Sequence, residues 1–181
     1  MNHRRYATVA GITLAGIIAL GCGAGSTDTG SVSDKGAGSN AAPAAEEKPK
    51  VAKMGSGTVT FADGLAVSAK KPVKFTPSSY AAGHQRANTA VLIEVTISNG
   101  TKEPFDLALV TATAAFGAEG TQAERVYDSG KGITDFEGTL APGQKRTAKL
   151  AFSAPTKDTS TIGLTVKPDF DGSTALFEGG L

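Results

Sequence analysis

Hydrophobic and polar residues alternate most clearly over residues 91–98. One face of this run carries Val91, Ile93, Val95 and Ile97, and the other carries Leu92, Glu94, Thr96 and Ser98. A two-residue period of this kind predicts a β-strand with one buried face. The dipeptide Asn99-Gly100 follows directly. Because this dipeptide is typical of hairpin turns, we expect the strand to end in a hairpin at that point.

Shorter alternations of the same kind occur on both sides of this run. The candidate strands are Val59–Phe61, Leu65–Val67, Phe105–Phe116, Gln122–Tyr127, Ala148–Phe152, Ile162–Val166 and an edge strand at Thr174–Phe177. Turn residues separate them at Ala62-Asp63-Gly64 and Ala141-Pro142-Gly143. No segment shows a helical stripe, and all eight Phe of the chain lie within residues 58–181. We therefore expect one immunoglobulin-like antiparallel β-sandwich of about eight strands there.

Three sequence runs in this region carry a family resemblance. They are residues 88–100, the segment Pro104-Phe105-Asp106-Leu107, and residues 136–143 leading into the strand that ends Phe152-Ser153-Ala154-Pro155. Over residues 58–178 the chain resembles a family of immunoglobulin-like extracellular domains carried by lipoproteins of Gram-positive bacteria, especially high-GC species. That family is mainly a domain of unknown function, and its structural relatives include a secreted mycobacterial immunoprotective antigen.

The resemblance implies a fold but no chemistry. Its motifs are strand and turn patterns, and the family offers no catalytic residues to transfer. An old label for the family, telomeric repeat-binding factor 2, finds no support in these residues. The domain also contains neither Cys nor Trp. It therefore lacks the Cys–Trp–Cys core of antibody domains, and the likeness to immunoglobulins is one of architecture alone.

The first 22 residues have the three-part pattern of an export signal. Arg4 and Arg5 precede an apolar run over residues 9–20, and Gly21 precedes Cys22, the only cysteine. This pattern resembles a bacterial lipoprotein signal, which implies a diacylglyceryl group on Cys22 and cleavage before it. The apolar run is shorter than the roughly 20 residues of a membrane-spanning helix. The Arg pair leaves export by the twin-arginine route open beside the general secretory route.

Residues 22–57 change composition abruptly. They are rich in Gly, Ser, Ala, Thr and Pro and contain no Phe, Tyr, Leu or Ile. Such a segment buries too little apolar surface to offset its ordering entropy, which predicts a disordered linker. A flexible chain of this length has a root-mean-square reach of roughly 30–35 Å. The predicted organisation is a signal peptide (1–21), a lipidated N-terminus with a linker (22–57) and a folded domain (58–181).

Few residues offer catalytic or metal-binding chemistry. After the signal the only histidine is His84, which we expect to be an exposed polar loop residue without a catalytic role. With one histidine and no further cysteine, we expect no zinc or copper site and no cofactor. Three acids, Asp128, Asp135 and Glu137, lie near one another in the sequence, and Asp169-Phe170-Asp171-Gly172 is similar to half of a calcium loop. Whether these acids bind calcium stays open.

Charge indicates no nucleic-acid partner. The whole chain has a formal net charge of +1, which loss of Arg4 and Arg5 with the signal would change to −1. Three lysines, Lys70, Lys71 and Lys74, form a small cluster that either protects a sheet edge or, with His84 and Arg86, contacts anionic wall polymers.

These observations favour a membrane-anchored cell-envelope lipoprotein. We expect it to present a non-catalytic β-sandwich outside the cell to an unidentified protein or cell-wall partner, while membrane lipid holds it through acylated Cys22. The alternative is an accessory lipoprotein that binds a solute or a wall polymer. We do not expect an enzyme.

Overall fold

The computed structural model describes residues 48–155, 157–169 and 173–181. The predicted signal, Cys22 and most of the predicted linker lie outside these residues. The described chain is an immunoglobulin-like β-sandwich, as the alternation predicted, and it contains two short 3₁₀ helices, η1 (Leu107–Leu109) and η2 (Ser129–Lys131). Within it, no helix is long and apolar enough to cross a membrane.

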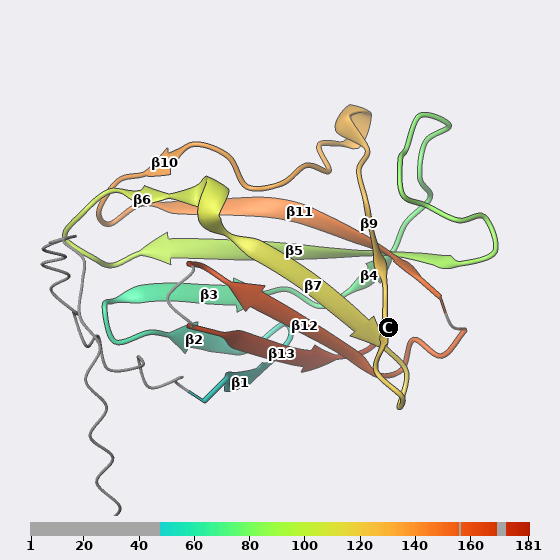
Figure 1. Ribbon diagram of the computed structural model, residues 1–181, viewed down its shortest axis with the longest axis horizontal. Coiled ribbons are helices and arrows are strands. Elements are labelled where there is room, and N and C mark those ends of the chain that lie inside the picture. The colour runs from blue at the N-terminus through green and yellow to red at the C-terminus, as the bar shows by residue number, and fades with distance from the viewer. Residues whose placement is uncertain (1–47, 156, 170–172) are drawn as a thin grey trace, which may run out of the picture. The chain divides into compact units, whose positions relative to one another are not determined.

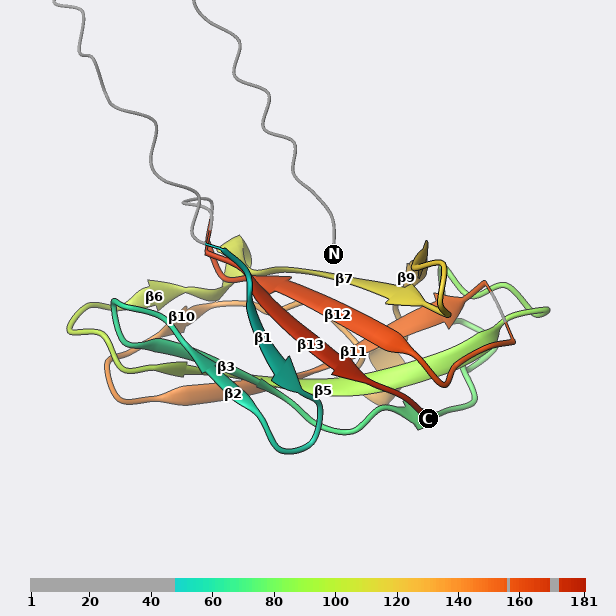
Figure 2. The ribbon, with the colours of Figure 1, turned by 90° about the horizontal axis from the view of Figure 1, so that it is seen from below.

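Two sheets form the layers of the sandwich (Figures 1 and 2). The first contains, in spatial order, β1 (Lys50–Lys53), β13 (Ala175–Gly179), β12 (Ile162–Lys167), β7 (Thr111–Phe116) and β8 (Thr121–Gln122). The second contains β2 (Thr58–Thr60), β3 (Leu65–Ala69), β5 (Thr89–Asn99), β11 (Lys145–Ala154) and β9 (Glu124–Val126), and β4 (Val73–Lys74) also pairs with β5. A separate two-stranded ribbon joins β6 (Phe105–Asp106) to β10 (Thr139–Leu140).

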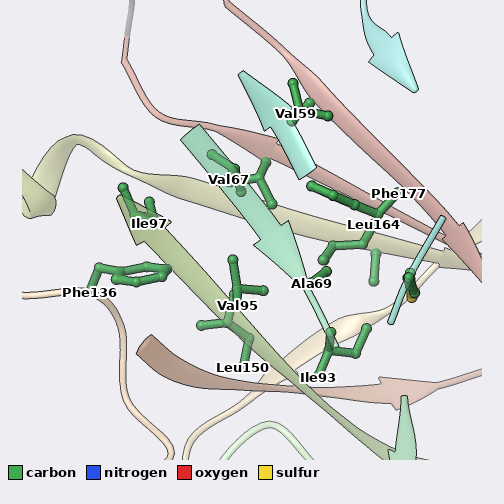
Figure 3. Packing of buried hydrophobic residues seen from close by; sticks show 14 of the residues in the cluster. Val59, Val67, Ala69, Ile93, Val95, Ile97, Phe136, Leu150, Leu164 and Phe177 are labelled. Atoms are coloured by element: carbon green, nitrogen blue, oxygen red, sulfur yellow. The ribbon is translucent and has the colours of Figure 1, made fainter. Parts of the chain in front are cut away.

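The core lies between the sheets. In β5 the odd-numbered residues from Val91 to Ile97 are fully buried and the even-numbered ones are half-buried, which confirms the predicted strand and its inward face. Figure 3 shows Ile93 and Val95 of β5 packed among side chains of β3 and β11, with Leu164 and Phe177 of the opposite sheet close by. Full burial of each such side chain contributes about 1.5–3 kcal/mol, so this core dominates the stability of the domain.

A second, smaller apolar cluster lies on the outer face of the second sheet. Val126, Ile133 and Ala151 are buried there, and Phe75, Ala81 and Leu92 pack against them. Leu92 belongs to the polar face of β5, yet it is only half-exposed because the β4–β5 connection and β9 cover it. This cluster fixes the β4–β5 connection, residues 75–88, against the sheet.

The folded domain begins before the predicted boundary at Thr58. Strand β1 lies in the predicted linker and pairs in parallel with β13, and Met54 after it is buried in the main core. The disordered-linker prediction is therefore wrong for residues 50–57. For the same reason Ala175–Gly179 is not an edge strand, because β1 lies on its outer side.

The predicted hairpin at Asn99-Gly100 is also wrong. Strand β5 pairs with β3, β4 and β11, whereas the next strand, β6, pairs with β10. Asn99 is buried, and its Nδ2 donates to the carbonyl oxygens of Glu103 (2.8 Å) and Leu140 (2.7 Å). Glycine is required at position 100 because of a close contact and not because of a hairpin turn. A Cβ there would collide with the backbone of Gly64.

Two predicted strands each divide into smaller elements. The run Phe105–Phe116 contains β6, η1 and β7. The run Gln122–Tyr127 contains the end of β8 and all of β9, which belong to different sheets. The chain therefore crosses between the two layers at Ala123, and this crossing places β9 beside the end of β11.

Candidate binding surface at one end of the sandwich

The β4–β5 connection lies at the end of the sandwich where β5 begins and β11 ends (Figure 1). Strand β9 pairs with β11 at the same end. The connection continues this sheet by one bridge: the amide of Ala82 donates to Tyr127 O (2.9 Å), and the amide of Tyr127 donates to Ala82 O (3.0 Å). These two backbone bonds tie the middle of the connection to the residue that follows β9.

A buried carboxylate holds the first half of the loop. Asp128 is 2% exposed, and its Oδ2 accepts the backbone amide of Ser78 (2.7 Å) while its Oδ1 accepts the Ser78 hydroxyl (2.9 Å). Close by, Lys131 Nζ donates to the carbonyl oxygen of Thr76 (2.7 Å). Hydrogen bonds to a charged group are stronger than those between neutral groups, so this contact fixes the path of the loop.

A buried serine holds the second half of the loop. Ser153 on β11 is 1% exposed, and its Oγ accepts the Gln85 amide (3.2 Å) and Asn88 Nδ2 (3.1 Å). The same Oγ lies 3.4 Å from Nδ1 of His84. Because two donors already occupy this oxygen, Nδ1 lies where it can accept the hydroxyl proton, an arrangement that requires the imidazole tautomer with its N–H on Nε2.

This environment differs from the exposed histidine predicted from the sequence. His84 is half-buried and anchored to Ser153 because the loop folds back onto the end of β11. The pair does not form a nucleophile with its base. Ser153 is sealed from solvent and serves as an acceptor for two loop donors, and none of the described carboxylates has a hydrogen bond to His84.

The backbone of Gly83 makes the close approach to β9 possible. Its φ is +79°, and a Cβ at this position would collide with the carbonyl oxygen of Arg125. Only glycine combines this left-handed conformation with the absence of a side chain. The small residues of the loop therefore have a structural role that the sequence alone did not reveal.

Arg125 fixes the strand on which the loop rests. Its guanidinium donates to Ala151 O (3.2 Å) and forms an ion pair with Asp135 (2.8 Å). It also lies 5.3 Å from the ring centre of Tyr127 and 5.1 Å from that of Phe152, which are cation–π distances. Strand β9 is only three residues long, and these contacts compensate for its short ladder.

The firmly held loop exposes an aromatic side chain. Tyr80 is 94% exposed, and Tyr127 on the neighbouring segment is 41% exposed. Beside Tyr80 lies a hollow of about 470 Å³, lined by Thr76, Pro77, Ser78, Ser79, Ala81, His84 and Arg86. We call the hollow together with Tyr80 and Tyr127 the loop-end surface.

The lysines predicted as a cluster do not join this hollow. Lys70 forms an ion pair with Glu94 (2.6 Å), and Lys70 and Lys71 line a separate shallow hollow with Val73, Leu92 and Glu94. Lys74 is exposed on β4. The fold therefore separates the residues that the sequence grouped, and of these five only His84 and Arg86 line the hollow of the loop-end surface.

Of the acids considered for calcium, Asp128 lies apart and is bound to Ser78. Asp135 and Glu137 line one hollow together with Arg146 and Lys149, and Asp135 is also paired with Arg125. In the part of the chain that the structure describes, no three His, Cys, Asp or Glu residues gather as metal ligands would. Residues 170–172 of the second acidic segment lie outside that part.

Sequence reasoning missed Tyr80, and it considered Asp128 only as a possible calcium ligand. A signal for Tyr80 was present, since it is an aromatic residue in the Ser- and Ala-rich part of a connection between strands. The role of Asp128 in holding the loop gave no local signal because its partner, Ser78, is 50 residues away in the chain.

Comparison with known proteins shows the family. The sequence profile of one family, described as "Domain of unknown function (DUF4352)", matches residues 55–175. The chain belongs to this family. The DUF4352 match begins close to the end of β1 and ends at the start of β13, so it covers nearly the whole sandwich. No curated protein matches the chain significantly.

Solved structures share the fold of this DUF4352 domain. The yjhA protein from Bacillus subtilis has a TM-score of 0.56 at 18% identity, over 70% of this chain and 97% of that one. A Bacillus subtilis protein described as a "putative lipoprotein (ycdA)" has a TM-score of 0.53 at 16% identity, over 65% of this chain and 37% of that one. The secreted protein MPT63 from Mycobacterium tuberculosis has a TM-score of 0.52 at 16% identity, over 75% and 99%. At these identities the similarity establishes the fold alone.

Proposed function

We propose that this protein is an extracytoplasmic, lipid-anchored interaction module without catalytic activity. The export-signal pattern that ends at Cys22 supports the anchor. Two proteins of the same fold support the location. MPT63 is a secreted protein, and the ycdA protein is described as a "putative lipoprotein". In this proposal the lipid fixes the protein to the membrane, the linker sets its reach, and the loop-end surface meets a protein partner.

One observation carries the proposal: a firmly held loop presents an almost fully exposed tyrosine. Tyr80 lies two residues from Ser78, which Asp128 holds, and two residues from Ala82, which bridges to β9. A loop ordered before binding loses little entropy on binding. Tyrosine is enriched among the residues that contribute most to protein interfaces. An exposed tyrosine on an ordered loop therefore suits partner binding better than any other described feature.

The environment of His84, the only histidine among the residues that the structure describes, supports a role without catalysis. Ser153 is the hydroxyl nearest to His84 in the hydrogen-bond network, and it is buried and already bonded to Gln85 and Asn88. A nucleophile must reach its substrate, and this one does not. The Ser153–His84 contact is therefore better suited to holding the loop.

Site-specific photo-cross-linking on intact cells tests the proposal. A photo-reactive amino acid replaces Tyr80 in one variant and Lys102 in a control, since Lys102 is exposed in the loop after the far end of β5. We expect one reproducible cross-linked protein from position 80 and none from position 102. Equal patterns from both positions, or no protein adduct at position 80, would overturn the proposal.

A second candidate function is an accessory lipoprotein that binds a solute or wall polymer. The hollow beside Tyr80 favours it, because Arg86, His84, Thr76 and Ser79 all line that hollow. In this case the ligand would occupy the hollow, and a photo-reactive group at position 80 would label a polymer instead of a protein.

A further inference from the structure

The loop-end hollow combines polar groups that have no partner of their own. Within residues 48–155, 157–169 and 173–181, the Arg86 guanidinium has neither an ion pair nor a hydrogen bond, and it lines the hollow. Thr76 and Ser79 line the same hollow with hydroxyls that make no hydrogen bond there. An unpaired guanidinium offers several N–H donors in a fixed plane, which suits a planar or tetrahedral oxyanion.

His84 adds a donor whose orientation is fixed. Its Nδ1 faces the Ser153 hydroxyl, which is directed to it by the two donors already bound to that oxygen. A ring whose Nδ1 accepts from Ser153 carries its N–H on Nε2, which leaves a donor at the side that Ser153 does not occupy. His84 lines the hollow, so this donor is placed on the surface that also carries Arg86.

The charges around the hollow favour an anion. Ser78 in its lining is bound to the Asp128 carboxylate, which is buried behind it and contributes one negative charge. Lys131 Nζ is bound to the carbonyl oxygen of Thr76 and balances that charge. Among the residues that line the hollow, Arg86 carries a positive charge and none is an Asp or a Glu. Of the acids near the loop, Asp135 pairs with Arg125, and Glu124, which contacts Gln85 (3.4 Å), lines a different hollow.

We propose that the hollow binds a phosphate group, with Arg86, the Nε2 of His84 and the hydroxyls of Thr76 and Ser79 as its donors. The phosphate belongs either to a phosphodiester polymer of the cell envelope or to soluble inorganic phosphate. This inference adds a ligand to the loop-end surface. It rests on the proposed function only in that both the partner and the phosphate would bind to the β4–β5 connection. Tyr80 is not among the donors, so loss of a protein partner in Tyr80→Ala and loss of phosphate binding in Arg86→Gln are separate outcomes.

Nuclear magnetic resonance of the acylated protein in a non-ionic detergent tests this site. His84 is the only histidine after the predicted signal, so its ring protons report on the hollow directly. The probes are inorganic phosphate and a glycerol-phosphate oligomer at constant pH and ionic strength, with glycerol and chloride as controls. The variant Arg86→Gln removes the cation from the hollow. The control, Lys102→Gln, makes the same charge change beyond the far end of β5, roughly 35 Å away. Salt screens electrostatic effects over that distance.

We expect a saturable shift of the His84 ring protons with at least one phosphate probe. Arg86→Gln should weaken the apparent affinity at least about tenfold, since it removes a charged hydrogen bond, and Lys102→Gln should change it less than about twofold. Tighter binding of the oligomer identifies the polymer as the source, and tighter binding of inorganic phosphate identifies the soluble ion. No saturable shift with either probe, or an equal loss in both variants, would overturn the proposal.

Discussion

At the scale of single residues, the loop-end surface depends on polar side chains that are buried. Asp128 and Ser153 together hold Ser78, Gln85 and Asn88, and so they fix both halves of a connection that has no regular structure. Burying a carboxylate is costly unless it is fully hydrogen-bonded, and Ser78 satisfies both of its oxygens. These two residues are therefore the ones on which the position of Tyr80 depends.

Asp128→Ala should destabilise the domain by about 2–3 kcal/mol, because it leaves the Ser78 amide without its charged acceptor in a half-buried site. Urea unfolding measures this change in the free energy of unfolding. The matched control is Asp135→Ala, whose carboxylate is 58% exposed in an ion pair with Arg125 and should contribute no more than about 1 kcal/mol. Equal effects of the two substitutions would show that Asp128 does not hold the loop.

At the scale of elements, strands with a long alternating pattern were predictable from the sequence, whereas features that depend on contacts between distant residues were not. The strand β5 was predictable because its alternation is long and its inward residues are all large and apolar. Asn99-Gly100 misled because the Asn99 side chain bonds to Leu140, 41 residues away, and β5 does not form a hairpin with β6. The loop-end surface was predictable only in part: His84 and Arg86 were singled out, whereas the roles of Asp128 and Ser153 depend on partners more than 45 residues distant.

Strand β1 escaped prediction for a related reason. Its sequence, Lys-Val-Ala-Lys, has too few apolar residues for a recognisable period, and Val51 is in fact exposed. Its order comes from pairing with β13 at the other end of the chain and from the burial of Met54. Contacts between residues this far apart in the chain cannot be recognised from the local pattern of apolar and polar residues.

A variant that begins at Thr58 should be less stable than one that begins at Lys48. It loses the β1–β13 ladder and the buried Met54 side chain, and removal of a buried methionine side chain alone costs about 2–5 kcal/mol. Thermal unfolding followed by circular dichroism compares the two variants. Equal melting temperatures would restore the domain boundary at residue 58.

At the scale of the whole molecule, each part of the chain has one task in the proposed function. In that proposal the N-terminal signal would deliver the protein, acylated Cys22 would anchor it, the sandwich would support the loop, and the loop-end surface would meet the partner. Rigid scaffolds that carry ordered binding loops at one end are a common arrangement among β-sandwich domains.

Cys22→Ala tests the anchor. Two or more acyl chains give stable membrane binding, whereas none remains if the only cysteine is removed. We expect the variant to leave the membrane fraction for the medium or to accumulate as an uncleaved precursor, as cell fractionation with mass spectrometry measures. An unchanged mass and an unchanged distribution would refute lipidation at this residue.

The most direct test of the central claim is the yield of cross-linked partner on intact cells for Tyr80→Ala, compared with the unsubstituted protein by quantitative mass spectrometry. The control is Val51→Ala, which also removes an exposed apolar side chain (59% exposed) but does so on β1. We predict that Tyr80→Ala lowers the yield at least about tenfold, as for a residue that dominates an interface, while Val51→Ala leaves it unchanged. An unchanged yield for Tyr80→Ala, or an equal loss for Val51→Ala, would contradict binding through the loop-end surface.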